Sequence, residues 1–183
     1  MTDLRAMIRD VPDFPKKGIV FKDITPLLSD PRALRACIEQ LAACVPRPEA
    51  VVAIESRGFI FGTALAMHWD VPFVPARKFG KLPGETVREM YSLEYGEDTL
   101  EIHRDALRPG QRVVLVDDLL ATGGTAAATV RLVEQLEAKI TACLFVVELA
   151  GLGGRERLGS YRVEALITFA TEGSEPAREQ PRR

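Results

Sequence analysis

Residues that cross-link or ligate are scarce in this sequence. It has three cysteines and two histidines in 183 residues. The cysteines show no CxxC spacing, which argues against a disulfide framework or a thiolate metal site. Residues 1–8 contain an early acid and no apolar run, so they do not resemble a secretory signal peptide. No run approaches the ~18–20 apolar residues of a membrane span. We therefore expect a soluble cytoplasmic protein with no membrane partner.

An excess of positive charge is also missing. Lysine and arginine total 24 against 26 aspartates and glutamates, for a net charge of −2. The chain thus lacks the general attraction that nucleic-acid binders use, and we expect no nucleic-acid partner. The basic residues are scattered, which still allows a local cationic site. The length fits one domain, which we place at residues 1–171, followed by a charged and flexible tail at 172–183.

Hydrophobic periodicity predicts alternating strands and helices. Residues 2–10 predict a short helix and 19–21 a short strand, and residues 34–45 have the apolar spacing of an amphipathic helix that begins after Asp30. Further strands are expected at 50–54, 71–75, 112–116, 142–147 and 163–167, and further helices at 58–68, 124–138 and 151–158. Residues 78–99 predict a long loop or a mobile hairpin. This alternation is typical of an α/β fold with a mostly parallel central sheet flanked by helices.

The strongest strand signal, residues 112–116, runs directly into two carboxylates, Asp117 and Asp118. Adjacent carboxylates repel each other unless a cation or hydroxyl donors satisfy them, and a ribose diol with Mg²⁺ nearby would do so. After a short turn, a helix begins with small residues and hydroxyls. Backbone N–H groups and hydroxyls in such a turn form a cradle for one phosphate group. The cradle consists of Ala121, Thr122, Gly123, Gly124 and Thr125. Neither a Walker loop nor a GxGxxG fingerprint is present.

Residues 113–125 resemble the 5-phosphoribosyl-1-pyrophosphate (PRPP) motif of the type I phosphoribosyltransferases. Their particular form, Asp-Asp-Leu-Leu-Ala-Thr-Gly-Gly-Thr, resembles the adenine phosphoribosyltransferases within that family. The likeness extends over roughly residues 5–170. It includes the segments 13–15, 18–28, 55–62, 77–84 and 91–96. The resemblance implies the type I fold, with an N-terminal base-binding hood at residues 1–30 and a flexible lid loop at 78–95.

The resemblance also implies where pyrophosphate binds. The turn Ser56, Arg57 and Gly58 follows the strand at 50–54, and Gly58 would expose backbone N–H groups. A second group of cations follows the next strand and would neutralise the leaving group. It comprises Arg77, Lys78 and Lys81, with Arg88 further along. In related enzymes this arm reaches toward the neighbouring subunit, which implies a homodimer and allows Arg77 to serve the partner's site.

The base site is expected on the hood and the lid. Phe21 could stack on adenine, while backbone groups of Val20 and Lys22 could read its edge. The resemblance makes Glu94 the acid/base that handles the purine proton, with Tyr95 supporting the closed lid. Asp117 and Asp118 complete the catalytic set by holding the ribose, with Mg²⁺ bound alongside PRPP.

The implied reaction is adenine plus PRPP giving AMP plus pyrophosphate, a step of purine salvage. One alternative keeps the fold and changes the base to hypoxanthine-guanine, xanthine or orotate. Hypoxanthine-guanine enzymes carry an acid where Ala121 stands here, and its absence favours adenine. A second alternative is a PRPP-sensing regulator without activity, but such proteins usually attach a DNA-binding module, for which the chain has no spare length.

Overall fold

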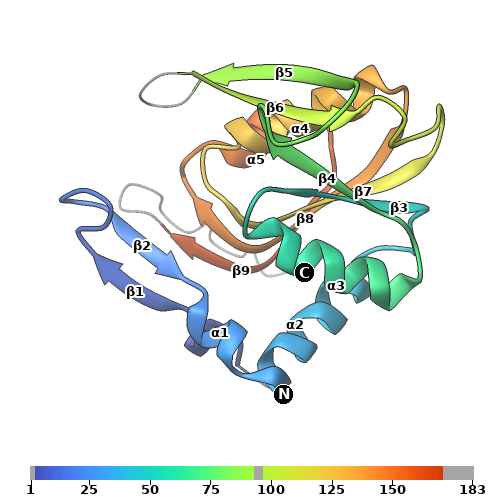
Figure 1. The fold of residues 1–183 in the computed structure, drawn as a ribbon. Helices are drawn as coiled ribbons and strands as arrows, with labels where there is room; N and C mark the ends of the chain where they lie inside the picture. Colours follow the sequence, from blue (N-terminus) through green and yellow to red (C-terminus); the bar gives the residue numbers. More distant parts are fainter. Residues whose placement is uncertain (1–2, 93–96, 171–183) are drawn as a thin grey trace, which may run out of the picture.

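The computed structural model describes residues 3–92 and 97–170. A seven-stranded sheet in the order β5-β6-β4-β3-β7-β8-β9 forms its centre, and a two-stranded sheet β1-β2 lies to one side (Figure 1). Strands β4, β3, β7, β8 and β9 run parallel to one another, whereas β6 is antiparallel to both of its neighbours, β4 and β5. The strands are β1 (Arg9–Pro12), β2 (Val20–Asp23), β3 (Ala50–Ile54), β4 (Phe73–Lys78), β5 (Thr86–Ser92), β6 (Glu97–His103), β7 (Arg112–Leu120), β8 (Lys139–Ala150) and β9 (Val163–Ala170). The helices are η1 (Arg5–Met7), α1 (Thr25–Ser29), α2 (Pro31–Ala43), α3 (Gly58–Trp69), α4 (Gly124–Gln135) and α5 (Gly154–Leu158).

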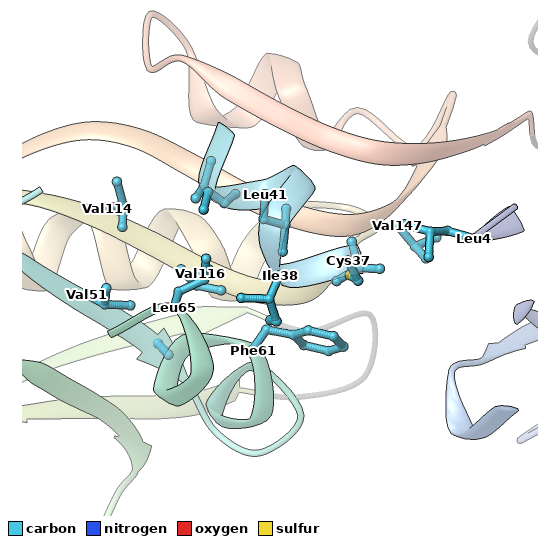
Figure 2. Packing of buried hydrophobic residues seen from close by; sticks show 14 of the residues in the cluster. Leu4, Cys37, Ile38, Leu41, Val51, Phe61, Leu65, Val114, Val116 and Val147 are labelled. Atoms are coloured by element: carbon cyan, nitrogen blue, oxygen red, sulfur yellow. The ribbon is translucent and has the colours of Figure 1, made fainter. Parts of the chain in front are cut away.

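Strand β3 is buried along its whole length, and its alternate residues supply both faces of the core. Val51 and Ala53 belong to the cluster formed with α2 and α3, part of which is seen in Figure 2. Ala50 and Val52 pack on the opposite side with α4. A strand covered on both faces must be apolar throughout, as residues 50–54 are. The packing on both sides fixes the end of β3, where the chain turns toward the site.

The N-terminal segment, η1 and the hairpin β1-β2, contacts an aromatic ring of the main sheet. The guanidinium of Arg5 lies 4.5 Å from the centre of the Phe169 ring on β9, and the Lys22 ammonium lies 4.1 Å from it. Each cation is attracted to the electron-rich face of the ring. Lys22 also forms an ion pair of 2.6 Å with Asp10. These contacts hold β2 beside the end of β9.

The predicted fold class is confirmed, and several local predictions are corrected. Residues 2–10 do not form one helix, because the described part divides into η1 and strand β1. Strand β1 exists through its antiparallel pairing with β2, a contact that local periodicity does not report. Helix α1 was missed. Residues 78–99 were expected to form a long loop or a mobile hairpin, and the structure contains the hairpin β5-β6 there, with β6 continuing to His103. The tail at 172–183 lies outside the described residues.

Candidate active site

The candidate site lies where the direction of the sheet's connections reverses. From β3 the chain passes through α3 to β4 on one side, while β7 pairs with β3 on the other. In open α/β sheets, ligands bind at the carboxyl ends of strands at such a point. A cleft of about 450 Å³ opens there. Its lining residues are Ile54, Glu55, Ser56, Arg57, Lys78, Tyr91, Asp98, Asp117, Asp118 and Thr125.

The acidic pair, Asp117 and Asp118, extends β7 into this cleft. Asp118 is 3% exposed and Asp117 is half-buried. The backbone N–H of Asp118 donates to Oδ1 of Asp117 at 2.8 Å. Arg57 Nε lies 2.9 Å from Oδ2 of Asp118, close enough for an ion pair. The alignment is not that of a hydrogen bond, so this buried oxygen has no hydrogen-bond donor among the described residues. An oxygen in this position can accept a donor from a ligand.

Burial and mutual repulsion disfavour two full charges on the pair. Burial raises the pKa of Asp117 well above its ordinary value, and the charge of Asp118 raises it further. Burial also raises the pKa of Asp118, against the opposing effect of Arg57. Two interacting carboxyls of this kind titrate as a unit rather than singly. A cation or hydroxyl donors at the pair would relieve the cost of ionising both groups.

The phosphate loop, residues 121–125, turns back over the end of β7 and opens α4. It surrounds a hollow of about 100 Å³ that is also lined by Asp117. Gly123 has φ 75° and caps α4. A Cβ at Gly123 would lie 2.8 Å from the carbonyl oxygen of Gly154, and a Cβ at Gly154 would lie 2.4 Å from that of Ala121. The loop therefore rests on the start of α5 at a distance that only glycines permit.

The turn Ser56, Arg57 and Gly58 connects β3 to α3 on the opposite wall. The peptide bond between Glu55 and Ser56 is cis. A Cβ at Gly58 would lie 2.8 Å from Oδ1 of Asp117, so glycine allows the turn to approach the acidic pair. Besides its contact with Asp118, the Arg57 guanidinium lies 5.2 Å from the centre of the Phe21 ring. Arg57 thus connects the hood to the acidic pair.

The cations expected to follow the strand at 71–75 do not all enter the cleft, and Arg77 and Lys78 form the last two residues of β4. Lys78 lines it and forms an ion pair of 3.1 Å with Asp98. The guanidinium of Arg77 instead binds Glu55 at 3.1 and 3.2 Å and donates to the carbonyl of Lys81 at 3.0 Å. Hydrogen bonding from Arg77 lowers the pKa of Glu55. Lys81 is exposed and is not among the lining residues of this cleft.

Three polar lining residues received no role in the sequence analysis: Glu55, Tyr91 and Asp98. The Tyr91 hydroxyl lies 3.4 Å from Oδ2 of Asp98, the oxygen that also binds Lys78. Tyr91 and Asp98 are opposite each other on β5 and β6. That pairing, and the contact of β6 with β4, bring them to the cleft, and no local pattern in the sequence reveals either.

Glu94 and Tyr95 lie outside the described residues. On the hood, Val20 is exposed while Phe21 and Lys22 are partly buried.

The acidic pair could supply part of a Mg²⁺ site that substrate phosphates and water would complete. Among the described residues, no group of three or more potential ligands could enclose a metal ion. Mg²⁺ usually keeps several waters and is held by one or two carboxylates together with substrate phosphates. A carboxylate pair with one oxygen lacking a donor, beside a phosphate loop, suits that mode of binding.

Comparisons with known proteins agree with this geometry. Residues 25–172 match the phosphoribosyl transferase domain family. An adenine phosphoribosyltransferase of Carboxydothermus hydrogenoformans is 56% identical over 91% of this chain and 99% of its own length. The crystal structure of the Thermoanaerobacter pseudethanolicus enzyme of that name is 52% identical, covers 91% of this chain and 98% of its own, and superposes with a TM-score of 0.89. The Saccharomyces cerevisiae enzyme, solved with adenine and an imino-altritol bisphosphate, is 42% identical, covers 90% and 96% of the two chains, and has a TM-score of 0.85. The chain therefore belongs to the adenine phosphoribosyltransferase family, within the type I phosphoribosyltransferases.

Proposed function

We propose that this chain transfers the phosphoribosyl group of PRPP to adenine, giving AMP and pyrophosphate. The observation that carries the proposal is the meeting of three features in one cleft: the acidic pair, the phosphate loop and the turn at Ser56. PRPP presents a diol, a 5′-phosphate and a pyrophosphate, and the three features suit these groups in turn. The adenine bound by the yeast relative supports the choice of base.

Each feature then has a chemical task. The phosphate loop holds the 5′-phosphate with backbone N–H groups and the hydroxyls of Thr122 and Thr125, and the start of α4 adds a partial positive charge. Asp117 and Asp118 accept the ribose hydroxyls. The turn at Ser56, Arg57 and Gly58, together with Lys78, faces the pyrophosphate, whose negative charge grows as it leaves.

In the reaction, the bond between ribose C1′ and the pyrophosphate oxygen breaks, and N9 of adenine bonds to C1′. The electron pair of the broken bond leaves with pyrophosphate, and the proton on N9 is lost. We assign the handling of the purine proton to Glu94. Bound Mg²⁺, held by the acidic pair and the substrate's oxygens, would supply positive charge at the ribose and pyrophosphate. A lid formed by residues 78–95 would exclude water, which otherwise hydrolyses the activated sugar.

Base recognition is assigned to the hood. Phe21 lies over the same Arg57 that contacts Asp118, so a purine stacked on Phe21 would lie next to the ribose site. Phe14 supports the Phe21 ring in an edge-on contact with centroids 5.2 Å apart. Phe21→Ala should therefore raise KM for adenine by about tenfold or more, since stacked aromatic contacts are worth about 0.5–1.5 kcal/mol beyond the area they bury. Val20→Ile keeps the backbone groups and should leave the choice of base unchanged.

Product analysis tests the reaction as a whole. Purified protein is incubated with PRPP, Mg²⁺ and each free base in turn, and the nucleotides and pyrophosphate are quantified. We expect AMP from adenine, with kcat/KM about 10⁴-fold above that for hypoxanthine or guanine, because the wrong base leaves buried donors and acceptors unpaired. Conversion of either base within about tenfold of adenine would overturn the adenine assignment. Absence of any nucleotide product would overturn the enzymatic assignment.

We further infer a cytoplasmic homodimer. The outer surface of α3 carries the exposed apolar residues Ile60, 41% exposed, and Met67, 77% exposed, two turns apart on one face. Such a stripe on a helix supports self-association. The three cysteines are free thiols, and Cys37 and Cys143 are buried, which suits a reducing compartment. No helix within the described residues is long and apolar enough to cross a membrane.

A further inference from the structure

One buried carboxylate close to the site has no part in the chemistry described so far. Glu101, on β6, is 1% exposed. Its Oε1 accepts three consecutive backbone N–H groups, those of Gly80, Lys81 and Leu82, at 3.0, 3.2 and 3.1 Å. Three successive amides that converge on one oxygen form a nest of the kind that binds anions. Here the protein fills the nest with its own side chain.

The other oxygen of Glu101 is held from β5. Oε2 accepts the Thr86 hydroxyl at 3.1 Å and lies 3.4 Å from Nε of Arg88. Burial alone would raise the pKa of Glu101, but the hydrogen bonds of Leu82, Thr86 and the neighbouring amides outweigh that effect and lower it. The carboxylate is therefore charged at neutral pH and saturated with donors.

The turn that Glu101 binds also accepts a hydrogen bond from Arg77. In the sheet register Glu101 lies directly opposite Arg77 on β4 and Arg88 on β5. The Arg77 guanidinium does not bind this carboxylate, although the two face each other. It donates to the carbonyl of Lys81, within the turn, and to Glu55 at the end of β3. Because the amides of the turn satisfy Glu101, Arg77 is left to bridge the turn and the rim of the cleft.

We propose that Glu101 is a positioning residue that sets the turn at Phe79–Leu82 and, through it, the Arg77–Glu55 contact beside the pyrophosphate-binding turn. Glu101 does not touch substrate. It acts on PRPP through Arg77 and Glu55, whose backbone runs directly into Ser56. The inference rests on the proposed function, since it concerns how the same cleft binds pyrophosphate.

Steady-state kinetics of Glu101→Gln test the inference. The variant keeps the side-chain volume but replaces a charged acceptor with an amide, whose NH₂ group faces donors in either orientation. We expect KM for PRPP to rise by about tenfold, because the turn loses its charged acceptor and no longer holds Arg77 against Glu55 beside the pyrophosphate-binding turn. KM for adenine should stay within about twofold of wild type, because the base site is assigned to the hood, whereas Glu101 holds a turn that follows β4. A merely structural role would leave the ratio of the two KM values unchanged.

Two further variants sharpen the experiment. Glu49→Gln, directly before β3, loses contacts to Arg112 but leaves the nest intact, so it should keep both KM values. In Glu101→Ala the nest is vacated, and millimolar formate or acetate should restore PRPP binding by occupying it. If Glu101→Gln does not fold, Thr86→Val removes one donor to the same carboxylate and should still raise KM for PRPP alone.

The outcomes separate this inference from the proposed function. If the wild type is active but KM for PRPP is unchanged in Glu101→Gln, only the role of Glu101 is overturned. Thr86→Val replaces Glu101→Gln in this comparison if Glu101→Gln does not fold. An equal rise in KM for PRPP and KM for adenine would also overturn the role of Glu101 only. An inactive wild type would overturn the proposed function and the effect on PRPP together. Hydrogen exchange at Gly80, Lys81 and Leu82 provides a readout without catalysis, and unchanged exchange in the variant would contradict the control of the turn by Glu101.

Discussion

At the scale of single residues, the buried carboxylates Asp117 and Asp118 should bind substrate but destabilise the folded protein through their mutual repulsion. Each of Asp117→Asn and Asp118→Asn should lower kcat/KM by about a hundredfold or more, a loss similar to that of other preorganised polar groups at reaction centres. The melting temperature should rise, because the variants remove a buried charge repulsion, and such changes commonly add about 0.5–2 kcal/mol.

Calorimetry and initial rates on the two variants check both parts, with the exposed Asp105→Asn as the matched control. Wild-type activity in the double variant would remove the acidic pair from the mechanism.

Another carboxylate, Asp23, makes the hood sensitive to acid. The Thr25 hydroxyl and backbone N–H, followed by Arg9, lower the pKa of Asp23 from 3.8 to about 2. The folded state therefore gains from the ionised form above about pH 4, and it loses this gain as the pH falls toward 2. Asp23→Asn should weaken the dependence of stability on pH across that window.

Melting temperatures between pH 2 and pH 5 measure the difference. Asp13→Asn, a substitution between the two strands of the hood, serves as the control. A wild-type slope in Asp23→Asn would show that these contacts form without a net preference for the charged carboxylate.

At the scale of elements, the phosphate loop rests on α5, whose residues are not among those lining the cleft or the hollow. A methyl group at Gly154 would lie 2.4 Å from the Ala121 carbonyl and 2.8 Å from Leu120 Cγ. Gly154→Ala should therefore displace the loop, cost about 1–3 kcal/mol of stability and raise KM for PRPP.

Binding of ribose 5-phosphate by titration calorimetry tests the loop directly, because this ligand lacks the pyrophosphate. The exposed Arg157→Ala on the same helix should bind it normally. Equal affinity in Gly154→Ala would mean that the loop holds its shape without α5.

The segment proposed as a lid offers a second test at this scale. The part of it within the described residues includes β5, which packs against α4 through Glu89 and Arg131. We expect amide exchange over residues 79–92 to slow when PRPP and an unreactive adenine analogue are both bound. Exchange at α2 provides the internal reference, and identical protection with and without ligands would rule out closure of this segment.

For the whole molecule, the stripe on α3 predicts self-association. Met67→Glu places a charge on this apolar stripe and should shift sedimentation toward the monomer, whereas Arg35→Glu, exposed on α2, should not. A wild type that sediments as a monomer at assay concentration would refute the dimer.

Local sequence patterns predicted the parallel half of the molecule well. Residues 50–54 were predicted to form the strand that the structure contains, because a strand covered on both faces is a continuous apolar run. The phosphate loop was equally visible, since its glycines and threonines are consecutive. The antiparallel pieces were predicted less well: β1 was missed, and residues 78–99 were expected to be either a long loop or a mobile hairpin. These strands are partly exposed and lack a continuous apolar run.

The same distinction explains which site residues were missed. Asp117 and Thr125 follow a strong strand in sequence, so their position at the cleft could be inferred. Asp98 reaches Lys78 only because β6 joins β4, and Glu101 acquires its role only from a turn twenty residues earlier. Charged residues in a segment of weak periodicity carry no local sign of these contacts.

The central place of β3 also has a consequence for synthesis of the chain. Ala50 pairs with Val113, so β3 lacks one of its neighbours until β7 has left the ribosome. During that interval a wholly apolar strand has an open edge, which is the feature that most readily recruits another chain. The hairpin β5-β6 emerges meanwhile but joins β4, and so leaves that edge uncovered. Slow translation of residues 55–112 would therefore prolong the period in which nascent chains are most prone to aggregate.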